Sequence, residues 1–168
     1  ALWILPGIYS IQAQSILISP YLQNATPSSI VIMWETDVAG ESKVSYGLTP
    51  ALGQVISPTW ITTPGGKILY TATMTGLNAG TRYYYKVLTG GWQSGLFDFV
   101  TPPLPASEAP CRIVLMSDMQ KDGGNPNIFS NLINTSLLPY LDTAYGSPLT
   151  DHLQMALLPG DVVDQGNV

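Results

Sequence analysis

The 168-residue sequence predicts a mainly β fold, in which a β-sandwich is followed by the incomplete start of an α/β domain. Residues 15–101 contain short runs in which apolar and polar residues alternate, and turn sequences separate these runs. Four prolines within residues 101–110 then interrupt the pattern. After them, short continuous apolar runs flank a segment with helical spacing, which is typical of a strand–helix–strand unit.

The alternating runs predict strands whose apolar faces pack together. Ile30, Ile32 and Trp34 lie two residues apart, so a strand would turn all three toward one face. Tyr83 would lie at the start of a later strand, where a tyrosine hydroxyl commonly fixes the preceding turn. Glycine-rich turns separate the runs, which favours a sandwich or barrel. The runs cover approximately residues 30–35, 43–46, 70–74, 83–87 and 96–100.

The composition excludes several classes of partner. Charged residues make up 10% of the chain, the net charge is −5, and no cluster of basic residues occurs. Proteins that bind nucleic acid or anionic lipid carry such clusters, so we expect neither partner. The single cysteine, Cys111, rules out an intrachain disulfide and a zinc site built from several cysteines. We expect Cys111 to be a small buried residue.

Residues 1–13 have the composition of the end of a signal peptide. Residues 1–9 are apolar, the whole segment is uncharged, and Ala13 provides a small residue at the cleavage position. Pro6 and Gly7 interrupt the run, which is also too short for a transmembrane helix, so stable membrane insertion is not expected. The sequence thus predicts a secreted, periplasmic or extracellular protein. The alternative is that this segment is an ordinary hydrophobic first strand.

Residues 102–110 predict a stiff, proline-rich linker between two domains. The predicted sandwich covers residues 15–101, and a domain of a different class is expected over residues 111–168. About 58 residues are too few to close an α/β sheet, so we expect this second domain to be incomplete.

Two strands and one helix are predicted within the second domain. The continuous apolar runs Arg112–Met116 and Met155–Leu158 are typical of strands that are buried on both faces. Between them, apolar residues at helical spacing begin at Ile128. Proline is unfavourable inside a helix, so we expect the helix to end near Pro139.

Two aspartates, Asp118 and Asp161, directly follow these two predicted strands. Ligands of open α/β sheets bind beyond the carboxyl ends of the strands, so neighbouring strands would bring the two carboxylates together. Close carboxylates repel each other unless a proton or a cation lies between them, and their oxygens suit hard cations. The pair therefore predicts a two-metal site that hydrolyses a phosphoryl group with metal-bound water. Either aspartate alone is equally consistent with the capping of a turn.

Several motifs match known families. Ser117-Asp118-Met119-Gln120 and Gly160–Asn167 resemble the first two signature blocks of the calcineurin-like metallophosphoesterases. Gly76–Val87 and Phe99–Pro103 are similar to the fibronectin-III-like domain at the N-terminus of purple acid phosphatases. The order of these pieces also agrees, and the resemblance covers nearly all of residues 16–168.

The resemblance implies a role for each residue near the two strand ends. Asp118 would bind the first of two metal ions, and Asp161 would bridge both ions. Gln120 stands where many of these enzymes have a histidine ligand, and its carbonyl oxygen would ligate a hard ion. Asp164 stands where purple acid phosphatases carry the tyrosine that binds ferric iron, so a purple enzyme is not expected and Asp164 would instead support the ligands. The ions would be iron, zinc or manganese, and the substrate a phosphate ester.

The later motifs of this family, Gly-Asn-His-Asp/Glu, a lone His and Gly-His-x-His, do not occur in the chain. They supply the remaining ligands and the proton donor, so the catalytic residues stay unknown, and we do not expect this chain by itself to hold two metal ions tightly. We expect phosphatase activity of the parent protein and little or none of this chain.

The alternative function is a secreted sandwich module that contacts a protein or a glycan without catalysis. Trp60, Tyr84 and Trp92 would be the exposed aromatic residues of such a surface. The only histidine, His152, precedes the second predicted strand, so we expect it at a surface or a helix end.

Overall fold

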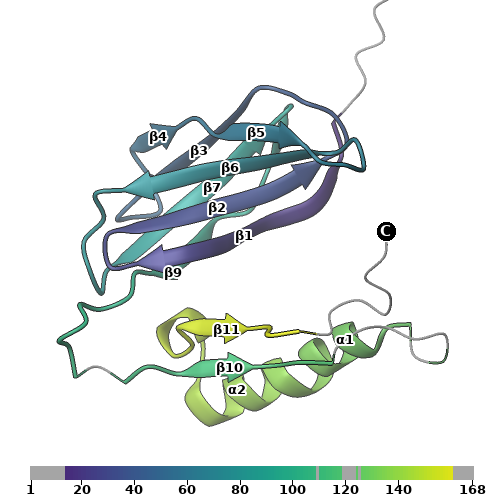
Figure 1. The fold of residues 1–168 in the computed structure, drawn as a ribbon. Helices are drawn as coiled ribbons and strands as arrows, with labels where there is room; N and C mark the ends of the chain where they lie inside the picture. Colours follow the sequence, from purple (N-terminus) through teal and green to yellow (C-terminus); the bar gives the residue numbers. More distant parts are fainter. Residues whose placement is uncertain (1–13, 109, 119–123, 125, 161–168) are drawn as a thin grey trace, which may run out of the picture. The chain divides into compact units, whose positions relative to one another are not determined.

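The computed structural model describes residues 14–108, 110–118, 124 and 126–160. The chain divides into two compact units, Ala1–Thr101 and Pro102–Val168, and each is a separate body (Figure 1). The first unit contains strands β1 to β9, and the second contains a helical segment with strands β10 and β11. The predicted signal-peptide remnant, residues 1–13, lies outside the described residues.

The first unit is a sandwich of two antiparallel sheets. One sheet has the order β1-β2-β6-β5, and the other has the order β4-β3-β7, with β8 and β9 both pairing with β7. This distribution of strands is that of immunoglobulin-like sandwiches and confirms the predicted fold class. The strands are β1 (Ile16–Thr26), β2 (Ser29–Thr36), β3 (Ser42–Gly47), β4 (Gln54–Ile56), β5 (Thr59–Thr62), β6 (Ile68–Thr75), β7 (Arg82–Thr89), β8 (Trp92–Gln93) and β9 (Phe97–Val100).

Alternation of side chains along β2, β6 and β7 builds the core of the sandwich. Ile30, Ile32 and Trp34 of β2 are all buried, which confirms the predicted face. Trp34 is directly opposite Tyr70 of β6, and the two rings stack with their centroids 5.1 Å apart. The side chains of the two sheets thus meet in one cluster. The cluster also contains Val44, Tyr46, Ile68, Ala72, Met74, Leu77, Tyr83, Tyr85, Val87 and Phe99.

Tyr85, on β7, is buried between Phe97 and Phe99, and this burial raises the pKa of its hydroxyl to about 12. A tyrosine of the unfolded chain ionises near pH 10, so between pH 10 and pH 12 only the unfolded chain loses this proton. The stability that Tyr85 contributes is therefore intact below pH 10 and decreases as the pH rises, by about 2 kcal/mol at pH 12. Urea unfolding of the wild type and of Tyr85→Phe at several pH values in this range measures the effect. If the free energy of unfolding fell equally steeply with pH in both proteins, the prediction would be contradicted.

A tyrosine corner closes the end of the sandwich where β2 begins. The backbone N–H of Asn78 donates to the hydroxyl of Tyr83 at 3.0 Å, as the sequence predicts. Thr101 completes the corner, because its hydroxyl accepts from the N–H of Thr81 at 2.9 Å and donates to the carbonyl of Asn78 at 2.6 Å. The last residue of the first unit is therefore fixed to the turn before β7.

Gln14 closes the other end, where β2 finishes. Its Nε2 donates to the hydroxyl of Thr36 at 2.9 Å and to the carbonyl of Val38 at 2.6 Å. Its Oε1 accepts from the hydroxyl of Thr89 at 3.2 Å. Thr36 belongs to one sheet and Thr89 to the other, so the amide of Gln14 connects the two sheets.

The second unit is a parallel strand pair joined through a helical segment, which agrees with the predicted strand–helix–strand order. Strand β10 pairs in parallel with β11. Among the described residues of this unit, Leu141 is the only apolar residue that is buried. The elements are β10 (Ile113–Leu115), α1 (Ile128–Asn131), the π-helix η1 (Leu132–Leu137), α2 (Leu138–Tyr145), the 3-10 helix η2 (Leu149–Asp151) and β11 (Met155–Leu157).

Three predictions about this unit are wrong. The strands are not buried on both faces, because Ile113, Leu115 and Leu157 remain 49%, 67% and 43% exposed. Two three-residue strands and one helical segment bury too little surface to enclose these side chains. Cys111, expected in a core, is exposed for the same reason.

The helix also does not end at Pro139. It widens into the π-helix Leu132–Leu137, and α2 then begins with Pro139 in its first turn. Proline lacks an amide hydrogen, and it lies just after a π-helix, where the regular bonds between residues four apart are already interrupted, so the helical segment continues past it. The described residues contain no helix that is long and apolar enough to cross a membrane.

Candidate metal centre

The parallel pairing of β10 and β11 brings the ends of the two strands to one edge of the sheet. Ile113 pairs with Met155 and Leu115 pairs with Leu157. The N–H of Met116 then donates to the carbonyl of Leu157 at 3.0 Å, so the two strands stay paired to their last residues. The chain therefore leaves both strands side by side, at the edge where open α/β sheets bind ligands.

Ser117 and Asp118 follow β10 at this edge. The hydroxyl of Ser117 donates to the carbonyl of Gly160, which follows β11, at 3.3 Å. Asp118 is exposed and has a backbone φ of 57°, in the left-handed region that aspartate enters more readily than most residues. The turn at Asp118 thus begins directly beside the end of β11.

Three of the four predicted site residues lie outside the described residues, namely Gln120, Asp161 and Asp164. Asp161 follows Gly160 directly in the sequence. Within the part of the chain that the structure describes, no group of three or more His, Cys, Asp and Glu side chains could hold a metal ion. These residues therefore offer one carboxylate, Asp118, at the strand edge.

His152 lies at the other end of the strand pair, as its position in the sequence predicts. Its backbone N–H donates to the carbonyl of Leu149 at 2.9 Å and closes the turn of η2. The residue precedes β11, so it lies at the amino end of that strand, away from Asp118. It therefore caps a turn and does not belong to the candidate metal centre.

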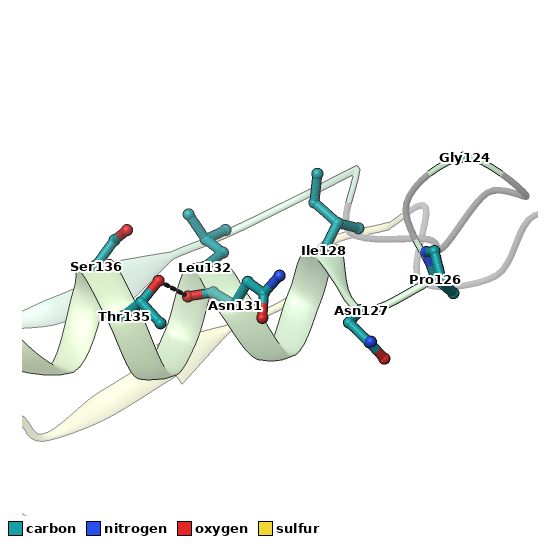
Figure 2. Close-up of a pocket in the computed structure, with 8 residues that line it drawn as sticks. All are labelled: Gly124, Pro126, Asn127, Ile128, Asn131, Leu132, Thr135 and Ser136. Carbon is teal, nitrogen blue, oxygen red and sulfur yellow. Dashed lines mark hydrogen bonds between the residues drawn. The ribbon is translucent and has the colours of Figure 1, made fainter.

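A pocket of about 380 Å³ lies at the start of the helical segment (Figure 2). Asn127, Asn131 and Thr135 recur on one side of the helix at four-residue spacing, and the hydroxyl of Thr135 donates to the carbonyl of Asn131 at 2.6 Å. The described residues of the lining carry amide and hydroxyl groups and no titratable side chain. This polar face is not among the predicted site residues, although its four-residue spacing is visible in the sequence. The lining residues are Gly124, Pro126, Asn127, Ile128, Asn131, Leu132, Thr135 and Ser136.

The three aromatic residues expected on a binding surface of the sandwich do not form one surface. Trp60 is 52% exposed on β5, in one sheet. Trp92 is half-buried on β8, in the other sheet, and packs against the core. Tyr84 is half-buried on β7. Only Trp60 therefore retains the exposure that a binding residue needs.

Residues 17–101 match the family described as Purple acid Phosphatase, N-terminal domain. The match covers half of the 168-residue chain and nearly all described residues of the sandwich. The chain belongs to this family. The purple acid phosphatase N-terminal domain is thus the fibronectin-III-like sandwich that the resemblance implied, and the match ends at Thr101, before β10.

Two solved structures are similar to parts of this chain at low sequence identity. The sensor domain of the anti-sigma factor RsgI4 from Pseudobacteroides cellulosolvens is 21% identical with a TM-score of 0.42, over 56% of this chain and 100% of that domain. PhoD is 17% identical with a TM-score of 0.48, over 60% of this chain and 22% of PhoD. No curated protein sequence matches the chain.

Proposed function

We propose that this chain is the front part of a metal-dependent phosphoric ester hydrolase of the acid phosphatase type. The observation that carries the proposal is the parallel pairing of β10 with β11, which directs Ser117–Asp118 and Gly160 to the same strand edge. Asp161, the next residue after Gly160, would join Asp118 there. Membership in the purple acid phosphatase N-terminal domain family supports the proposal, because the family is named after such enzymes.

Two metal ions, of iron, zinc or manganese, would be bound at this edge by Asp118, Gln120 and Asp161. The exposed carboxylate of Asp118 fits this role, because carboxylate and amide oxygens suit hard cations. Bound metal ions supply an activated water and stabilise the charge that develops on a phosphoryl group. Asp164 would orient the ligands through hydrogen bonds. In this proposal the remaining ligands come from the parent protein, and this chain has little or no activity by itself.

The proposed organisation of the chain has four parts. Residues 1–13 would be the remnant of a signal peptide, and the protein would be secreted, periplasmic or extracellular. Residues 15–101 form the sandwich, 102–110 would be the linker, and 111–168 would be the N-terminal part of a metallophosphoesterase domain.

Substitution of the two aspartates tests the metal centre. Titration calorimetry of the 168-residue chain with Mn²⁺ and with Zn²⁺ is expected to show binding that Asp118→Asn and Asp161→Asn each weaken by about tenfold or more. Glu41→Gln is the matched control, since it removes an exposed carboxylate of the sandwich. Equal affinity in all four proteins would contradict the assignment of both aspartates.

A second candidate function, contact with a protein or glycan, is favoured by exposed apolar residues on two edge strands of the sandwich. Val55 on β4 and Trp60 and Ile61 on β5 are exposed, and residues 44–66 contain no charge. Exposed tryptophan side chains such as that of Trp60 are common at interaction sites. Native electrophoresis through soluble polysaccharides is expected to show retardation that Trp60→Ala abolishes, and equal mobility of the wild type and the variant would contradict glycan binding.

A further inference from the structure

We propose that Ser117 is a positioning residue of the candidate metal centre, because its hydroxyl holds the end of β11 against the end of β10. This inference rests on the proposed function, since it assigns a support to the same metal ligands. It starts from the hydrogen bond between Ser117 Oγ and the carbonyl oxygen of Gly160.

The side chain of Ser117 continues a pairing that the backbone cannot continue. The last backbone bond between the two strands in the described residues joins the N–H of Met116 to the carbonyl of Leu157. Pro159, two residues later, has no amide hydrogen, so it cannot donate to the neighbouring strand. The hydroxyl of Ser117 supplies the next connection, at 3.3 Å from the carbonyl of Gly160.

This bond joins the two residues that directly precede the aspartates of the candidate metal centre. Ser117 immediately precedes Asp118, and Gly160 immediately precedes Asp161. Glycine has the widest choice of backbone conformations, and nothing among the described residues lies within 4 Å of the place where a Cβ of Gly160 would be. The bond from Ser117 is therefore the contact between described residues that restrains the carbonyl of Gly160. Loss of such a support typically weakens metal binding by about 10- to 100-fold.

The test compares Ser117→Ala, which removes the hydroxyl, with Ser117→Thr, which keeps it. In Mn²⁺ titrations of the 168-residue chain, Ser117→Ala is expected to bind about tenfold more weakly, whereas Ser117→Thr is expected to bind nearly as the wild type does. Ser57→Ala, at an exposed serine of the sandwich, is the matched control. Hydrogen exchange of the Met116 amide, which is paired with Leu157, is expected to accelerate in Ser117→Ala and not in the control.

The two readouts separate this inference from the proposed function. If the wild type binds Mn²⁺ through Asp118 and Ser117→Ala binds it equally well, the positioning role is wrong and the metal centre stands. If no variant binds Mn²⁺, the proposed metal centre loses its support, and exchange at Met116 still decides whether Ser117 holds the strand ends. An unchanged exchange rate in Ser117→Ala overturns the inference in either case.

Discussion

Replacement of Trp34 by alanine is expected to lower the free energy of unfolding of the sandwich by about 3–5 kcal/mol. Trp34 is fully buried in the centre of β2 and stacks on Tyr70. The substitution removes the apolar surface of the indole ring and leaves a cavity between the two sheets, which neighbouring strands cannot fill without losing their pairing. Urea unfolding measures the change, followed by the fluorescence of the remaining tryptophans, since all four lie before the linker.

Two further variants distinguish this packing effect from other effects of the substitution. Trp60→Ala removes the same side chain from an exposed position and is expected to change stability by about 0.5 kcal/mol or less. Trp34→Phe keeps an aromatic ring, and the buried Nε1 of Trp34 has no hydrogen-bond partner among the described residues, so this variant loses no such bond. If Trp34→Ala lowered the free energy of unfolding by about as little as Trp60→Ala does, the central role of Trp34 in the core would be contradicted.

The core strands could be predicted from the sequence because one face of each is buried. Burial of one face imposes period-two alternation, which is visible at Ile30, Ile32 and Trp34. Strand β1 was not predicted as a separate strand, because the irregular pairing between Ile16 and Tyr21 shifts its register and removes the alternation of side chains. Strands β4 and β5 lie at sheet edges and are largely exposed on both faces, so no periodic pattern marks them.

The candidate site could be predicted only in part. Asp118 was found because it ends an apolar run, and the parallel pairing of β10 with β11 follows from the strand–helix–strand order. The bond between Ser117 and Gly160 could not be predicted, since it joins residues 43 positions apart and depends on the register of the two strands. The structure places Asp118 at the strand edge, and the predicted roles of Asp118, Gln120, Asp161 and Asp164 remain predictions.

The turn between β7 and β8 leads to the second large effect. Gly90 and Gly91 have φ values of 52° and 89°, as a two-residue hairpin turn requires. A Cβ at Gly90 would overlap the side chain of Gln14, whereas a Cβ at Gly91 would meet nothing within 4 Å. Both glycines therefore have a positive φ, and only Gly90 lies against the amide that connects the sheets.

Gly90→Ala is expected to lower the free energy of unfolding by about 3 kcal/mol. Left-handed strain contributes about 1–2 kcal/mol, and displacement of the Gln14 amide from Thr36 and Thr89 contributes a similar amount. Gly91→Ala introduces backbone strain but no contact with Gln14. It is therefore expected to lower the free energy of unfolding by about 1–2 kcal/mol in the same urea titration. Equal costs at the two positions would mean that the amide of Gln14 does not stabilise the sandwich. A larger cost at Gly90 would show that one residue before β1 connects the two sheets, because the turn itself is the same in both variants.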